Sequence, residues 1–181
     1  MDSASAVSKT RRVEMSLQGV VKRMIVFAAA VLLGACQAGP ETTRMTAVQA
    51  AAIRDSAQAV LDAFRRYSAE GQWDSLGSLY ADDANFRWLE QGVVQYRSPA
   101  LMAQALRRVP PNTRIETSYH DTQFVALAPG VASITTAFHT RFVDEGTRGA
   151  EFSGVLNMTL VHREAGWRIL VGHSSSRPAG R

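Results

Sequence analysis

The sequence predicts an α+β domain in which helices cover one face of a curved, mostly antiparallel sheet. A long amphipathic helix pattern begins at residue 46, and four long runs of strand-forming residues fill the last third of the chain. Shorter helix and strand patterns lie between them. Because the long helix and the strands each carry one apolar face, we expect each to bury that face against the other.

The composition indicates one globular domain preceded by a targeting segment. The chain has 181 residues, of which 46% are hydrophobic and 20% charged. Its formal charge is +4, but residues 1–35 hold five of the 20 basic residues and only two of the 16 acidic ones. The remainder is almost balanced in charge, so the sequence does not indicate a nucleic-acid partner.

Residues 1–35 have the pattern of a signal peptide for export. The basic pair Lys22-Arg23 precedes the apolar run Met24–Leu33, which ends in small residues. The apolar run is roughly a dozen residues long, short of the ~20 that a membrane-spanning helix needs. Because the first 14 residues exceed what a signal requires, Met15 is an alternative start to Met1.

The signal segment ends at Cys36, the one cysteine of the sequence, which therefore has no partner for an internal disulfide. Leu33-Gly34-Ala35-Cys36 resembles the lipobox of bacterial lipoproteins. The resemblance implies cleavage before Cys36, a lipid on its sulfur and membrane lipid as a partner. Gln37 resembles the residue found in lipoproteins sent to the outer membrane, so we expect the periplasmic face of that membrane in a cell that has one. Residues 36–45 are then the lipidated cysteine and a tether.

The first helix is predicted to begin at Thr46, which forms a capping box with Gln49, and to end at Gly71. Its apolar residues fall on one stripe, which we expect to face the sheet: Ile53, Ala57, Val60, Leu61 and Phe64.

The middle of the chain carries short elements. We expect a helix over residues 73–80, strands over 85–89 and 93–96, and a helix that Ser98 caps. Pro99 suits the first position of that helix, which should run to about residue 108.

Four long strands are predicted over residues 114–128, 131–143, 151–162 and 167–175. The turns between them are short, so consecutive strands should pair as an antiparallel meander. We expect a single domain over residues 46–176 and a tail over 177–181.

Two segments carry a family resemblance. Residues 64–86 read as a helix end followed by Gly-x-Trp-x-x-Leu-x-x-Leu-Tyr-x-x-Asp-Ala-x-Phe, and residues 167–175 read Trp-Arg-Ile-Leu-Val-Gly-His-Ser-Ser. Their order is similar to that of the nuclear-transport-factor-2-like (NTF2-like) superfamily, in particular its SnoaL-like and DUF4440-type domains. The resemblance implies a cone-shaped half barrel, with about three helices on the concave side and a pocket at the wide end. Where relatives often have a Gly-Arg pair, this chain has Tyr96-Arg97-Ser98-Pro99, which leaves the substrate open.

Candidate pocket residues follow from strand alternation. In the last strand His173 shares a face with Val171 and Ile169, and the resemblance implies that this face points into the cone. The alternative is a hydrogen-bonded histidine at the end of the sheet. The candidate ligand-binding residues are Trp88, Tyr119, Phe138 and His173, although Trp88 and Phe138 also suit plain core packing.

The catalytic candidates are Asp121, Tyr119 and His173. Steroid-isomerase relatives use a carboxylate base with a phenol or an acid as hydrogen-bond donor. Asp121 and Tyr119 lie two positions apart on a predicted strand, which would place them on one face. The alternative is a solvated carboxylate on the strand. For His139, the polar face of its strand is expected to point outward, and the alternative is that it joins His173.

The motifs leave three functions open. The sequence has no phosphate-binding loop, no Gly-x-Ser-x-Gly and no metal-binding spacing of its four histidines, so no cofactor or metal is expected. The leading prediction is a membrane-anchored lipoprotein whose pocket binds a small, mainly apolar ligand. The alternatives are an enzyme of the isomerase or cyclase type, and an interaction module that forms a homodimer through its sheet.

Overall fold

The structure, a computed structural model, describes residues 45–110, 112–144 and 147–178. The predicted signal peptide, the lipidation of Cys36 and most of the tether and tail lie outside the described residues. Among the helices of the described part, none is both long and apolar enough to cross a membrane.

Three helices are described. α2 (Ala47–Glu70) begins at Thr46, whose side chain and that of Gln49 form the predicted capping box, and ends at Gly71, which has a left-handed φ of 65°. α3 (Trp73–Gly77) is shorter than predicted. The residues after it leave the helix because Leu79 and Ala81 exchange backbone hydrogen bonds with Ile169. α4 (Pro99–Leu106) begins after Ser98, as predicted.

Six strands form one mixed sheet in the order β2-β1-β6-β5-β4-β3. Their bounds are β1 (Arg87–Glu90), β2 (Val93–Tyr96), β3 (Arg114–Ala128), β4 (Val131–Asp144), β5 (Thr147–Arg163) and β6 (Gly166–Pro178). The antiparallel meander of the last four strands is confirmed. β1 pairs with β2 in antiparallel and with β6 in parallel, so the short hairpin joins the sheet beside the last strand.

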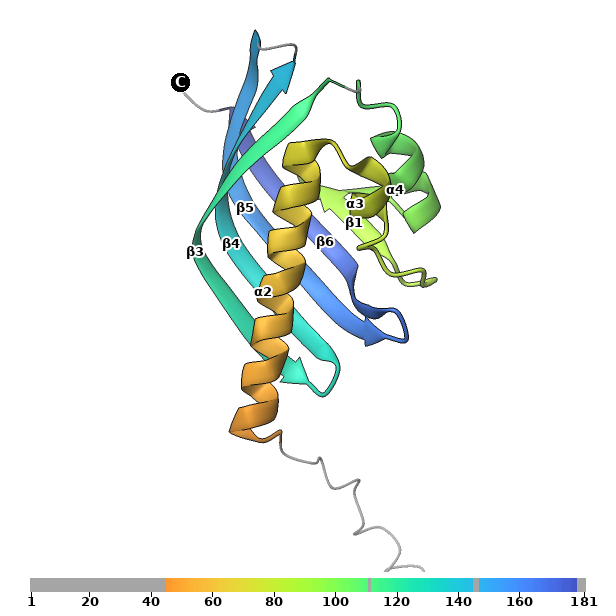
Figure 1. Cartoon of the computed structure of the whole chain (residues 1–181), viewed down its shortest axis with the longest axis vertical. Coiled ribbons are helices and arrows are strands. Elements are labelled where there is room, and N and C mark those ends of the chain that lie inside the picture. The colour runs from red at the N-terminus through yellow and green to blue at the C-terminus, as the bar shows by residue number, and fades with distance from the viewer. Residues whose placement is uncertain (1–44, 111, 145–146, 179–181) are drawn as a thin grey trace, which may run out of the picture. The chain divides into compact units, whose positions relative to one another are not determined.

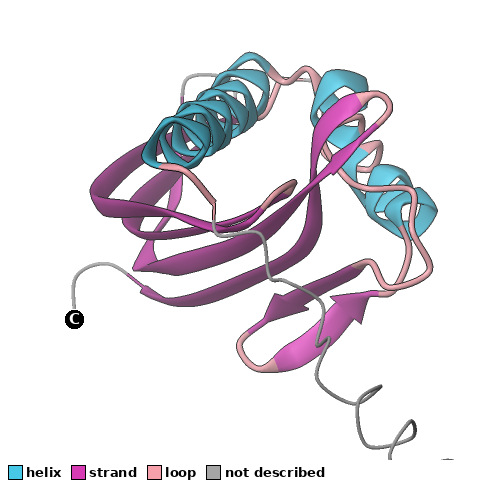
Figure 2. Ribbon diagram, turned by 90° about the horizontal axis from the view of Figure 1, so that it is seen from below, coloured by secondary structure: helices cyan, strands magenta, loops and turns pink. Residues whose placement is uncertain are grey.

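The sheet curves around α2, which lies along its concave face (Figure 1). Seen from the end, the helices occupy one side of the curved sheet, which does not close into a barrel (Figure 2). The predicted stripe of α2 is buried at Ile53, Ala57, Val60 and Leu61. It faces sheet residues such as Ile134 that are wholly buried. The α+β fold class is therefore confirmed.

Several bulges interrupt the pairing of the strands, and two of them bear on the candidate site residues. In β6, Ile169 pairs with Leu160 and Val171 with Thr159, so Leu170 is an extra residue. In β3 the pairing with β4 shifts between His120 and Gln123. Because an extra residue inverts the face of everything that follows it, each bulge decides which side chains reach the concave side.

Candidate functional site

A cavity of about 270 Å³ lies between the C-terminal half of α2, α4 and the concave face of the sheet. All six strands and the three helices contribute to its wall. The lining residues are Phe64, Ser68, Leu76, Tyr80, Trp88, Glu90, Tyr96, Met102, Ala105, Leu106, Val109, Ile115, Thr117, Tyr119, Phe138, Thr140, Leu156 and Ser174.

Aromatic rings form one side of the cavity. Phe64 of α2 stacks on Trp88 of β1, with ring centroids 6.1 Å apart and an angle of 15° between the ring planes. Tyr80 meets the same indole edge-on, with centroids 5.8 Å apart. Such contacts hold large side chains in fixed orientations, so this wall is preformed.

Two phenols supply polar groups to this mainly apolar space. Burial raises the pKa of Tyr80 and of Tyr119 above the ordinary value, so both remain protonated at physiological pH. Within the described part of the chain, neither hydroxyl has a hydrogen-bond partner. Both are therefore available as neutral donors to a molecule in the cavity. By contrast, Thr117 and Thr140 bond to each other through their hydroxyl oxygens at 2.8 Å.

Glu90 supplies the one carboxyl group among the lining residues that the structure describes. Its Oε1 accepts a hydrogen bond from Nε1 of Trp88 at 3.0 Å. Glu90 is exposed, so the carboxylate stands at the mouth of the cavity and not at its floor. Its charge adds to the rise in the pKa of Tyr80, which places the two groups within electrostatic reach of each other.

The sequence profile of the SnoaL-like domain matches residues 49–171, which extend from the first turn of α2 to the first half of β6. The chain belongs to the SnoaL-like domain family. This confirms the resemblance to SnoaL-like domains, while the DUF4440 type and the lipoprotein signal are not tested by this match.

Solved structures resemble the SnoaL-like domain in fold. An NTF2-like protein with a cystatin-like fold from Novosphingobium aromaticivorans is 13% identical, with a TM-score of 0.57 over 69% of this chain and 82% of that one. An NTF2-like protein of unknown function from Shewanella oneidensis is 13% identical, with a TM-score of 0.53 over 67% and 97%. The β subunit of benzoate 1,2-dioxygenase from Burkholderia mallei is 14% identical, with a TM-score of 0.57 over 67% and 88%. At these identities the likeness shows the NTF2-like fold alone. A comparison with curated protein sequences gives no match.

Three of the four candidate ligand-binding residues line the cavity of the SnoaL-like domain: Trp88, Tyr119 and Phe138. His173 does not, and its predicted face was wrong. Its neighbours in sequence, Gly172 and Ser174, face the concave side, where Gly172 lies against Trp88 and Ser174 lines the cavity. His173 therefore points to the convex side, beside the exposed Asn157. The bulge at Leu170 inverted the alternation.

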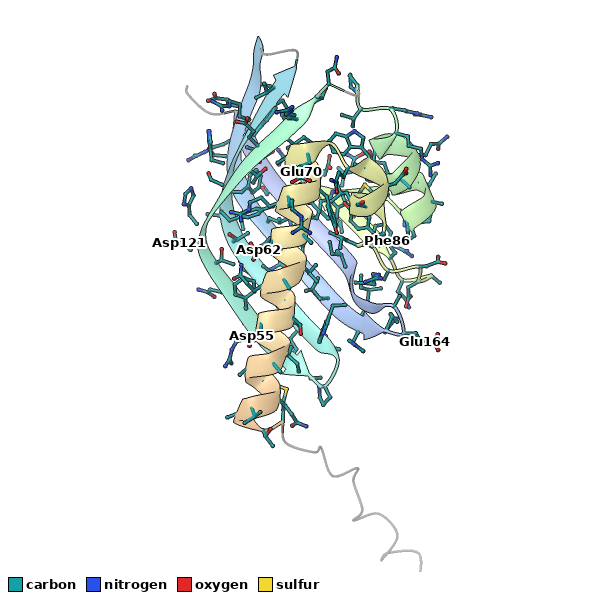
Figure 3. The ribbon with its side chains drawn as sticks, viewed as in Figure 1. Asp55, Asp62, Glu70, Phe86, Asp121 and Glu164 are labelled. Carbon is teal, nitrogen blue, oxygen red and sulfur yellow. The ribbon has the colours of Figure 1, made fainter. Side chains whose placement is uncertain are left out.

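The predicted pair of Asp121 and Tyr119 on one face was also wrong. Asp121 lies in the β3 bulge with a positive φ of 52°, and it is exposed. Figure 3 shows Asp121 at the outer edge of the sheet, away from α2. Tyr119 faces inward, so the two side chains are on opposite sides of the strand.

His139 lies on the convex side, as the polar pattern of its strand predicted. Its Nδ1 lies 3.0 Å from Oγ of Ser153 on β5. It does not meet His173, which is on a strand beyond β5. Within the described residues, no three His, Cys, Asp or Glu side chains lie close enough together to hold a metal ion.

Sequence reasoning missed Glu90, Tyr80 and Tyr96 as lining residues. A signal for Glu90 was present, because it lies two positions after Trp88 and therefore on the same face of a strand. Tyr80 lies in the segment that carries the family resemblance, but its hydroxyl reaches the cavity only because the chain pairs there with Ile169.

Proposed function

We propose that this SnoaL-like domain binds a small, mainly apolar ligand in its cavity, and that lipidated Cys36 holds it at a membrane surface. The observation that carries the binding proposal is the cavity itself, with an aromatic and aliphatic wall and few polar groups. Concave, largely apolar sites with a few fixed polar groups are the usual binding sites for small molecules.

The polar groups suit the orientation of such a ligand. Tyr80 and Tyr119 are neutral donors without protein acceptors in the described part of the chain, and Glu90 is an acceptor at the mouth. A ligand with an acceptor at its inner end would satisfy the phenols, which otherwise meet only water.

The anchor proposal is supported by the sequence before the domain. A basic pair, a short apolar run and Leu33-Gly34-Ala35-Cys36 follow one another, and α2 begins eleven residues after Cys36 with a complete capping box. A single acyl chain holds a protein only reversibly, whereas two or more give stable attachment. We expect the periplasmic face of the outer membrane as the location.

An isomerase or cyclase activity is the second candidate, because Glu90 lies near the phenol of Tyr80. A carboxylate could remove a proton from the carbon next to a substrate carbonyl, while the phenols donate hydrogen bonds to the carbonyl oxygen. This arrangement would catalyse enolisation. Glu90 is exposed, and the carboxylates and histidines first expected in the pocket, Asp121 and His173, lie outside it. These placements favour binding over catalysis.

The remaining candidate is a homodimer through the convex face of the sheet. Exposed apolar residues on β3 and β5 support it: Val125, Leu127 and Val155. On the same convex face they are interspersed with polar residues such as Asn157 and His139. A mixed surface of this kind supports the dimer less strongly than the cavity supports binding.

The binding proposal is tested with 2-naphthol, a neutral two-ring probe, by titration calorimetry on the full-length chain. We expect saturable binding that is lost in Ala105→Phe, which places a ring in the cavity. Ala100→Phe is the matched control, because it adds the same ring to an exposed position of the same helix. Absence of binding by the wild type, or equal binding by the two variants, would contradict a ligand site in this cavity.

A further inference from the structure

The cavity carries a negative charge as well as an apolar wall. Its lining holds one carboxylate, Glu90, and none of the Lys, Arg or His side chains of the described residues. An anionic ligand would therefore face a like charge at the mouth with no compensating cation, which is unfavourable. A neutral or a cationic ligand meets no such penalty.

The aromatic wall favours the cation. Ring faces carry the negative part of the aromatic quadrupole and attract ammonium groups, with Trp the strongest partner. Besides the packed rings of Phe64, Trp88 and Tyr80, the lining contains three further aromatic side chains: Tyr96, Tyr119 and Phe138.

The hydrogen bond between Trp88 and Glu90 holds the charge of the cavity in place. The indole N–H donates to Oε1 of Glu90 at 3.0 Å, which fixes the carboxylate beside the mouth. The indole itself is covered by Phe64 and by the backbone of Gly172. Trp88 therefore positions the counter-charge for an ammonium group, and the aromatic contact comes from the other rings of the lining.

Arg65, a basic side chain outside the lining, does not cancel the negative charge of Glu90. Arg65 acts on the pKa of Tyr119, but only as a cause secondary to burial. It lies on the exposed side of α2, outside the lining, and pairs with Asp62 at 3.4 Å. Its charge is therefore partly compensated at the surface.

Resting on the proposed function, we infer that the ligand of this cavity is a small organic cation, an ammonium group carried on an apolar body of one or two rings. The volume sets the size, because about 270 Å³ lies just below the usual range of roughly 300–1,000 Å³ for sites that take drug-sized molecules. The sign comes from Glu90 and the ring faces.

The test compares two probes of the same shape, phenyltrimethylammonium and tert-butylbenzene, which differ in one charged nitrogen in place of carbon. Each is titrated against 2-naphthol bound to the full-length chain, and displacement is followed by ligand NMR. We expect the cation to displace 2-naphthol at about a tenfold lower concentration than the neutral probe.

Glu90→Gln separates the charge from the shape, because glutamine keeps an acceptor for the Trp88 N–H. We expect it to reduce the preference for the cation several-fold and to leave tert-butylbenzene unchanged. Glu164→Gln, in the turn between β5 and β6 away from the cavity, is the matched control (Figure 3). Equal affinity of the two probes, or an unchanged preference in Glu90→Gln, would overturn this inference. Binding of 2-naphthol in the same experiment would still support the proposed function. Failure of all three probes would overturn both.

Discussion

The indole of Trp88 lies directly against the backbone of Gly172. A β-carbon at position 172 would stand 2.1 Å from Cε3 and Cζ3 of that ring, far inside any contact that carbon atoms tolerate. Gly172 is therefore what allows β6 to approach the aromatic wall of the cavity, and the two residues are also partners in the parallel pairing of β1 with β6.

Gly172→Ala should consequently lower the free energy of unfolding by about 1–3 kcal/mol, since the indole must move to admit the methyl group. Chemical denaturation measures the change. Gly77→Ala is the matched control, because a β-carbon there meets only Cβ of Ala103 at 3.8 Å. If the two variants were equally stable, the close approach of Trp88 to β6 would be wrong.

Substitution of two phenylalanines should have different effects on stability, because one lies in the core and the other in the cavity wall. Phe86 is fully buried, so Phe86→Ala should cost about 3–5 kcal/mol of unfolding free energy. Phe64 is half-buried beside the cavity, and Phe64→Ala should cost less, about 1–3 kcal/mol. Denaturation of both variants gives the order. A larger loss at Phe64 would mean that its ring packs in the core instead of bordering a cavity.

The buried phenols predict a loss of stability at high pH. Burial raises the folded-state pKa of Tyr80 and Tyr119, so above about pH 10 the unfolded chain releases protons that the folded chain keeps. The free energy of unfolding should therefore fall as the pH rises from about 10. Absorbance at 295 nm should show these phenols ionising only as the protein unfolds.

Tyr80→Phe and Tyr119→Phe should each flatten that alkaline dependence, and Tyr67→Phe is the matched control. An ionisation step of unchanged size in both variants, with the fold intact, would show that these phenols are not held in their neutral form.

At low pH, the interactions of Asp83 should make the free energy of unfolding fall as the pH decreases. It accepts hydrogen bonds from the backbone N–H of Asn85 and from Arg163, each at 2.8 Å, and these lower its pKa below the ordinary value. The interactions stabilise the fold above about pH 4 and are lost as the pH falls through the folded-state pKa. Wild type should therefore be more stable than Asp83→Asn at pH 7. This difference in unfolding free energy should be smaller at pH 3. Asp82→Asn is the control, and a constant difference at both values would contradict the role of Asp83.

Cys36→Ser tests the proposed anchor. Without the thiol no lipid can be attached, so the variant should move from the membrane fraction to the soluble fraction, or remain as an uncleaved precursor. Cell fractionation and intact-mass measurement of natively purified protein check both points. A wild-type chain that carries no lipid, with an unchanged distribution in the variant, would rule the anchor out.

Local signals predicted the parts of the fold that depend on neighbouring residues. The capping box of Thr46 and the left-handed Gly71 mark the ends of α2 because both depend on the chain within a few residues. The strand runs and short turns predicted the meander for the same reason. The parallel partner of β1 was not predictable in this way, since it is set by residues far along the chain.

The site was predicted only where the alternation of strands was regular. Tyr119 and Phe138 reach the cavity as predicted, and they pair with each other in a regular part of the β3–β4 ladder. His173 and Asp121 were misplaced because a bulge lies just before or at each position. A bulge depends on the register of two strands, and neither position carries the glycine that would have marked it.

The parallel pairing of β1 with β6 also sets the order in which the domain can be completed. Gln91, directly after β1, bonds to Ser176, which lies 85 positions later. Until the last strand has been synthesised, Trp88 of β1 has no Gly172 to lie against and remains exposed. Pairings between such distant residues form slowly, and chains interrupted before them are prone to aggregate. A chain truncated before residue 171 would thus keep its helices and most of its meander, and still lack a closed binding site.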